Sequence, residues 1–112
     1  MSPGFAVAQA LITLTCDGEL HDYEQGNIVA RATGATTIDL SRNLLTTPAG
    51  IFRISGVSDA KYYIEQADAL RRVWGSLDRY TGRLAVMWNR HGEVRQLSYL
   101  LELQCYAAQR LF

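Results

Sequence analysis

The segment from Ser58 to Arg79 constrains the fold most, because its apolar side chains recur at the spacing of an amphipathic helix. Ser58 is a good N-cap residue, and Asp59 suits the positive end of a helix. The apolar stripe consists of Ala60, Tyr63, Ala67, Leu70, Trp74 and Leu77. Gly82 follows as a stop signal. The sequence therefore predicts a long helix from Asp59 to Arg79.

A short apolar run, Arg83 to Trp88, follows this predicted helix directly. Its residues do not alternate between apolar and polar, which is typical of a strand covered on both faces. A long helix that leads into such a strand indicates a crossover between parallel strands. Together the two segments predict a layered α/β fold.

A hairpin is predicted near the N-terminus. Leu20 to Tyr23 and Ile28 to Thr33 flank the run Glu24-Gln25-Gly26-Asn27. Gly26 and Asn27 can adopt positive φ and close the turn. A strand from Leu11 to Thr15 precedes this hairpin and is followed by Asp17-Gly18, a turn signal.

The middle of the chain is punctuated by glycine and proline. Gly50 to Gly56 is too short for a helix between its glycines, so it predicts a central strand. The run Thr36 to Leu45 allows two interpretations. We favour a short helix that Thr36 caps, and the alternative is a strand from Thr37 to Leu40. Pro48 ends either element.

The last segment, Glu93 to Phe112, has the length and composition of a helix. One apolar stripe consists of Val94, Leu97, Leu101, Cys105, Ala108 and Phe112. Tyr99, Leu103 and Tyr106 form a second stripe on the opposite side, which predicts an interface for self-association. Alternatively, Asn89 to Gly92 forms a hairpin loop that leads into a strand from Val94 to Leu100.

Composition limits the size and the partners of the protein. The chain has 112 residues, 48% of them hydrophobic, which supports one core and hence one domain over residues 1–112. Its 11 basic and 11 acidic residues cancel and are scattered, so neither nucleic acid nor a membrane is expected as a partner. Without a signal-peptide pattern, the expected location is the cytoplasm. There, Cys16 and Cys105 are expected to be reduced and buried.

The common motifs of catalysis, nucleotide binding and metal binding do not occur in the sequence, so we expect no cofactor and do not expect an enzyme. Cys16 with His21 or His91 is a candidate thiolate and imidazole pair, but a packed cysteine explains Cys16 better.

Four carboxylates lie close together in the sequence, at Asp17, Glu19, Asp22 and Glu24. Carboxylates are suitable ligands for calcium or magnesium, but the spacing does not match the calcium loop of an EF-hand. We therefore interpret them as solvated loop charges and expect no metal.

Aromatic residues suggest a different kind of site. Tyr63 and Trp74 lie on the predicted core stripe, whereas Tyr62 lies off it. Tyr62 and Trp88 are the candidate ligand-binding residues, for an apolar or aromatic molecule held between the sheet and a helix.

The order of the predicted elements resembles the STAS domain family over about residues 20 to 112. Ile28 to Gly34 resembles that family's strand that ends in glycine before its first helix. Phe52 to Val57 resembles the strand before the switch loop, and Arg83 to Met87 is similar to the strand after the second helix. The resemblance implies the order β-β-β-α-β-α-β-α.

The switch loop departs from the family pattern. In anti-sigma factor antagonists of this family, an Asp-Ser-Ser type loop carries a serine that is phosphorylated. The matching stretch here is Val57 to Tyr63, where lysine and tyrosines replace aspartate and serine. Ser58 is the remaining candidate switch residue, and N-capping of the helix explains it.

These observations predict an α/β domain with a single small sheet of about four to five strands and helices packed on it. The alternative is an α+β fold with an antiparallel sheet. The expected function is a non-enzymatic protein-interaction or regulatory module with an unknown protein partner, self-associating as a homodimer or other homo-oligomer. The alternative function is a small-molecule binding protein.

Overall fold

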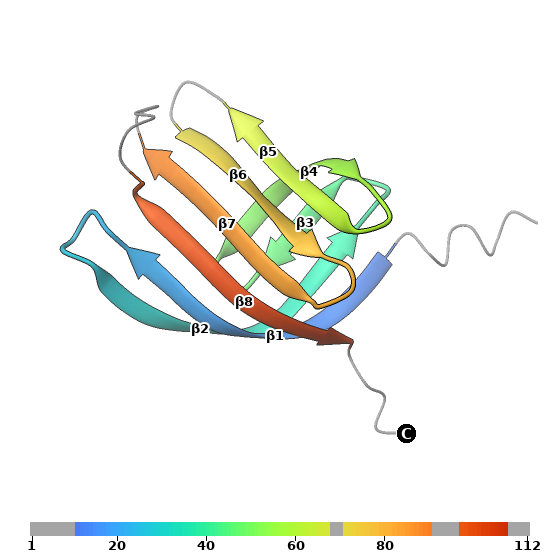
Figure 1. Ribbon diagram of the computed structural model, residues 1–112, viewed down its shortest axis with the longest axis horizontal. Coiled ribbons are helices and arrows are strands. Elements are labelled where there is room, and N and C mark those ends of the chain that lie inside the picture. The colour runs from blue at the N-terminus through green and yellow to red at the C-terminus, as the bar shows by residue number, and fades with distance from the viewer. Residues whose placement is uncertain (1–10, 68–70, 91–96, 108–112) are drawn as a thin grey trace, which may run out of the picture.

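A computed structural model describes residues 11–67, 71–90 and 97–107 of the chain. These residues form eight strands and no helix. The strands are β1 (Leu11–Asp22), β2 (Ile28–Asp39), β3 (Leu44–Thr47), β4 (Gly50–Val57), β5 (Lys61–Ala67), β6 (Arg71–Asp78), β7 (Arg83–Arg90) and β8 (Tyr99–Ala107). Each strand pairs antiparallel with the next, and β8 pairs with β1, which closes a barrel (Figure 1).

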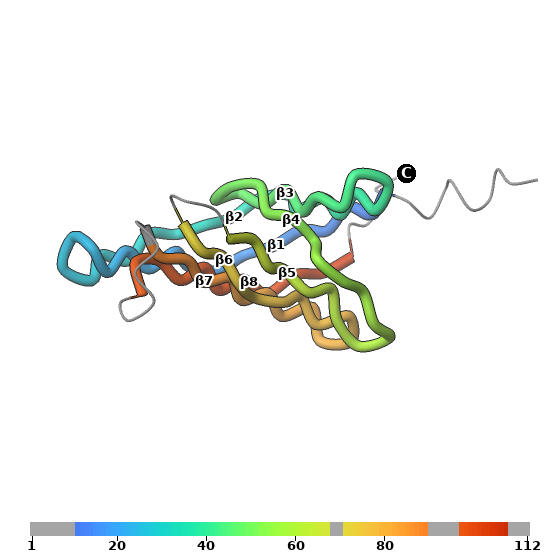
Figure 2. The backbone as a smooth tube through the Cα atoms, turned by 90° about the horizontal axis from the view of Figure 1, so that it is seen from above, coloured from blue at the N-terminus to red at the C-terminus, as the bar shows by residue number. Residues whose placement is uncertain are grey.

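This architecture corrects the predicted fold class. The α/β prediction, its α+β alternative and the resemblance to STAS domains are wrong, because all of them require helices packed on a sheet. In the barrel, β3 and β4 lie on the opposite side from β7 and β8 (Figure 2). The described chain therefore buries its core inside one curved sheet, and no helix layer contributes to it.

The predicted helix from Asp59 to Arg79 is instead the pair of strands β5 and β6. Tyr62 and Ile64 are buried, and their neighbours Tyr63 and Glu65 are exposed, so the side chains alternate with period two. The apparent helical stripe combined Tyr63 and Trp74, which alternate with the buried residues of their strands, with the buried Leu77. Ser58, the predicted helix cap, accepts hydrogen bonds from the amides of Ala60 and Lys61 in the β4–β5 loop at 3.2 and 3.0 Å.

The strand predicted from Arg83 to Trp88 is present in β7, but the parallel crossover is wrong. β7 pairs antiparallel with both β6 and β8. Leu84, Val86 and Trp88 are buried, whereas Ala85 and Met87 are partly exposed, so the strand is not covered on both faces. The outward residues Ala85 and Met87 are also apolar, which hid this alternation in the sequence.

The predicted C-terminal helix is also wrong within the described residues, because Tyr99–Ala107 forms β8. Leu101, Leu103 and Cys105 are buried in alternation with partly exposed Glu102 and Gln104. Of the alternative strand from Val94 to Leu100, residues 94–96 lie outside the described residues, and Tyr99 and Leu100 are the first two residues of β8.

Predictions for the N-terminal half were closer. The hairpin is confirmed, with Gly26 and Asn27 at φ of 81° and 65°. The turn at Asp17-Gly18 is wrong, since β1 continues through it to Asp22. The favoured helix at Thr36 is wrong and the alternative strand from Thr37 is confirmed within β2. The strand at Gly50 is confirmed as β4.

Aromatic side chains from β4, β7 and β8 pack together inside the barrel. Trp88 stacks on Tyr99 with ring centroids 5.1 Å apart, and it contacts Phe52 at 5.4 Å. Such ring pairs add to the stabilisation from apolar burial. Tyr99, at the start of β8, thus belongs to an aromatic cluster at one end of the barrel interior.

Candidate functional site: a cavity at one end of the barrel

A cavity of about 460 Å³ lies at the end of the barrel where β1 begins and β8 ends. The turn between β6 and β7 lies at this same end (Figure 1). The cavity is lined by Ile12, Leu14, Ile38, Tyr62, Leu77, Asp78, Arg79, Tyr80, Thr81, Gly82, Cys105, Tyr106 and Ala107. Eight-stranded barrels are wide enough to be filled by side chains or to hold one small ligand.

The walls of the cavity are apolar because inward positions alternate along the strands. Ile12 and Leu14 face inward from β1, Ile38 from β2 and Leu77 from β6. Ile38 and Leu77 are almost completely buried, whereas Ile12 and Leu14 are only half-buried because they border the cavity. An apolar molecule in this space would remove these side chains from water.

Tyr62 lines the cavity from β5, and the Arg79 guanidinium lies over its ring, 4.9 Å from the ring centroid. Arg79 Nη1 donates a hydrogen bond to the Ser58 carbonyl at 2.6 Å, and its backbone amide donates to the Ala60 carbonyl at 2.7 Å. These contacts connect the β6–β7 turn to the β4–β5 loop. They place a cation at the rim of the cavity, over an aromatic face.

The β6–β7 turn forms the other part of the rim and is stabilised by Asp78. Its Oδ1 accepts hydrogen bonds from the amides of Tyr80 and Thr81 at 2.8 and 3.0 Å. The hydrogen bond from the Thr81 amide, followed by that from Tyr80, lowers the pKa of Asp78 below its ordinary value. Asp78 is therefore ionised at neutral pH and its charge is engaged by the turn.

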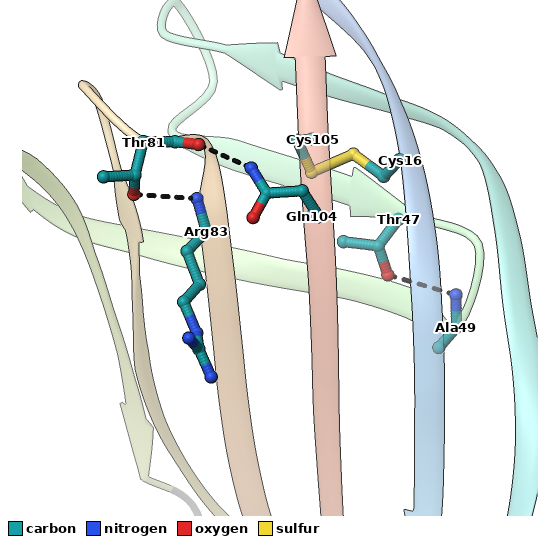
Figure 3. The surroundings of a disulfide bond; sticks show 7 residues. All are labelled: Cys16, Thr47, Ala49, Thr81, Arg83, Gln104 and Cys105. Atoms are coloured by element: carbon teal, nitrogen blue, oxygen red, sulfur yellow. Dashed lines mark hydrogen bonds between the residues drawn. A yellow bond between two sulfur atoms is a disulfide. The ribbon is translucent and has the colours of Figure 1, made fainter.

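A disulfide joins Cys16 in β1 to Cys105 in β8, directly across the pair of strands that closes the barrel (Figure 3). The two Cα atoms are 4.1 Å apart, and both side chains are buried. Burial of the cysteines is confirmed, but the prediction that they are reduced is wrong. Beside the bridge, Gln104 Nε2 donates to the Thr81 carbonyl at 2.5 Å, which connects β8 to the cavity rim.

Of the two predicted ligand-binding residues, the structure places Tyr62 at the cavity and Trp88 away from it. Trp88 belongs to the aromatic cluster at the other half of the barrel and does not line the cavity. Arg79 and Asp78 were missed because the helical interpretation placed no site at the C-terminal end of the predicted helix. Alternation at Tyr62, Ile64, Val73 and Leu77 was the signal that would have identified the strands and hence the rim.

The predicted interface residues do not form one surface. Leu103 is 3% exposed and faces the interior, Tyr99 is stacked on Trp88, and Tyr106 is 63% exposed at the cavity rim. Ser58, the candidate switch residue, lies in the β4–β5 loop, where its hydroxyl stabilises the turn.

The remaining sequence candidates also lie apart from the cavity. Cys16 has no free thiol to pair with His21, and His91 lies outside the described residues. Asp17 contacts Arg31 at 3.0 Å and Thr33 at 2.6 Å. Within the described residues, no three histidine, cysteine or acidic side chains converge as a metal site would require.

Fold and cavity together define this chain as an up-and-down antiparallel barrel with an apolar cavity at one end. Comparison with family models, with curated proteins and with solved structures finds no match for this chain. Across the ranges that the structure describes, no helix has the length and hydrophobicity needed to cross a bilayer.

Proposed function

We propose that the protein binds one small apolar molecule in the cavity at the open end of its barrel. The observation that carries this proposal is the volume of about 460 Å³ between apolar walls, at the opposite end of the barrel from the aromatic cluster. Ligand sites are mostly apolar, concave and a few hundred Å³ in volume, with a few polar groups that orient the ligand. Tyr62, Asp78 and Arg79 supply such groups here.

The neutral fluorescent probe N-phenyl-1-naphthylamine tests this function, because its emission rises in an apolar site. We expect saturable binding of one probe per chain. Leu14→Trp projects an indole into the cavity and should weaken binding at least about tenfold, since the lost volume excludes the probe. Thr15→Trp is the matched control, because Thr15 is the exposed neighbour on the outer face of β1.

Both variants are first compared with the wild type in thermal unfolding, so that a folding defect is recognised. Binding that does not saturate, or that Leu14→Trp and Thr15→Trp change equally, would show that the probe does not occupy the cavity. The small-molecule function would then be rejected.

Self-association, the function expected first from the sequence, stays a prediction and needs a new structural basis. Among the described residues, β2 pairs with β3 only at Thr37–Asp39, so Ile28–Thr36 pairs with β1 alone. Ile28 and Val29 are exposed on this free edge. Free strand edges pair readily with a second chain. Light scattering that finds a monomer at high concentration, unchanged by Val29→Lys, would exclude this edge as an interface.

The cytoplasmic location is likewise a proposal, and the Cys16–Cys105 disulfide is the observation against it. Disulfides persist mainly in oxidising compartments, where glutathione and thioredoxin do not reduce them. Alkylation of the protein in freshly lysed native cells decides the question. Two alkylated thiols support the cytoplasm, and none supports an oxidising compartment.

A further inference from the structure

Among the described residues that line the cavity, one is a cation, Arg79, and one is an anion, Asp78, and their charges are not equally available. Asp78 Oδ1 already accepts two turn amides, from Tyr80 and Thr81. Lys61 lies directly across from Asp78 in the β5–β6 register, and its charge also lowers the pKa of Asp78. The acidic member of the rim is thus ionised, and its Oδ1 atom is already occupied by the amides of the turn.

Arg79 is different. Among the described residues, its guanidinium makes no ion pair with a carboxylate, whereas Arg31, Arg42 and Arg83 each lie within 4.0 Å of one. A guanidinium has five N–H donors, and one Arg79 donor is used by the Ser58 carbonyl at 2.6 Å. One face of the group rests on Tyr62, which restricts its orientation. The remaining donors form a fixed cationic site at the entrance of an apolar cavity.

Such a site favours a ligand with an acidic group at one end and an apolar body. Hydrogen bonds between arginine and a carboxylate are charge-assisted and stronger than neutral ones. At about 30 Å³ per water-sized group, a volume of 460 Å³ holds roughly 15 such groups, enough for a chain of about ten carbons with its head group. The apolar walls at Ile12, Leu14, Ile38 and Leu77 then contact the chain.

We infer that the ligand is a monoanionic amphiphile whose acidic group binds the Arg79 guanidinium while its apolar body occupies the cavity. This inference rests on the proposed function, and it adds the chemical class of the ligand. Arg79 determines specificity, and the apolar walls supply binding that is shared by charged and neutral ligands.

Three ligands of equal chain length test it: decanoate, decanol and decylamine, titrated by calorimetry below the concentrations at which they self-associate. We expect the protein to bind decanoate at least about tenfold more tightly than decanol, as one charge-assisted hydrogen-bonded contact warrants. Decylamine should bind most weakly, because the positive charge of its ammonium group is repelled by the Arg79 guanidinium.

Two variants test whether Arg79 causes the preference for decanoate over decanol. Arg79→Gln should bring the ratio of decanoate to decanol affinity to about one, since the charge is lost and the cavity walls remain. Arg83→Gln is the control, because Arg83 lies on the outer wall with its guanidinium 3.4 Å from Glu102, and it should leave the ratio unchanged. The ratio separates a role in specificity from a merely structural role of Arg79, which would weaken both ligands together.

The outcomes are distinct. Equal binding of decanoate and decanol, or preferred binding of decylamine, overturns the anionic ligand and leaves the apolar cavity function intact. A ratio that Arg79→Gln does not change assigns the preference to another group and also overturns the inference. No binding of any of the three ligands, together with no binding of N-phenyl-1-naphthylamine, rejects the proposed function itself.

Discussion

Glycine residues show how closely two β-strand backbones approach in this barrel. A side-chain Cβ at Gly75 in β6 would overlap the Ala85 carbonyl oxygen and lie 2.8 Å from the Val86 Cα. Both atoms belong to the backbone of β7, which cannot move without breaking the pairing of the two strands. Glycine is therefore required at position 75 because a side chain would overlap the backbone of β7, and not because of its own dihedral angles.

We predict that Gly75→Ala destabilises the protein by about 2–3 kcal/mol or more, because overpacking against backbone has no side chain to relieve it. Gly26→Ala is the matched control. Gly26 has a φ of 81° but meets no atom within 4 Å, so the change should cost only about 1 kcal/mol of backbone strain. Urea unfolding measures both free energies, and equal losses would show that β6 and β7 are not in close contact.

At the scale of single strands, the side chains of β5 distinguish most clearly between a strand and the predicted helix. Ile64 is 2% exposed and Tyr63 is 44% exposed. In the predicted helix the order was reversed, with Tyr63 on the core stripe. We expect Ile64→Ala to lower the free energy of unfolding by about 2–5 kcal/mol and Tyr63→Ala by less than about 1 kcal/mol. A larger loss from Tyr63→Ala would favour the helix.

The β6–β7 turn predicts how the stability of the protein changes with pH. Hydrogen bonds from the Thr81 and Tyr80 amides lower the pKa of Asp78, so its stabilising effect is complete above its ordinary value of 3.8. The effect is lost as the pH falls through the lowered pKa. The wild type should therefore exceed Asp78→Asn in urea midpoint at pH 7, and the difference should shrink below pH 3.8. A difference independent of pH would contradict this role.

Sequence predicted the strands well where turn residues marked them, as at Gly26-Asn27 and at Gly50. It failed in β5, β6 and β8, because an exposed tyrosine or tryptophan on a strand has the same apolar signal as a buried one. One of the two predicted ligand-binding residues, Tyr62, lines the cavity, and it was chosen for its aromatic ring. The cationic rim at Arg79 was not predicted, because it depends on the pairing of β5 with β6.

At the scale of the whole molecule, barrel closure depends on pairing the first described strand with the last. β1 and β8 are far apart along the chain, and their contact is in register from Leu14 with Ala107 to Asp22 with Tyr99. Non-local pairing of this kind carries a large loss of chain entropy. The Cys16–Cys105 bridge, with a sequence separation of 89 residues, removes part of that loss from the unfolded chain.

We predict that the double variant Cys16→Ala and Cys105→Ala keeps the far-ultraviolet circular dichroism of the wild type but loses about 2–4 kcal/mol of stability. Wild-type protein unfolded in dithiothreitol should lose a similar amount, which separates the bridge from the volume of the two sulfur atoms. Cooperative unfolding should persist, because the backbone pairing of β1 with β8 does not depend on the bridge. If oxidised, reduced and double-variant proteins are equally stable, closure is complete without the covalent link. Stability would then reside in the strand register and the buried core alone.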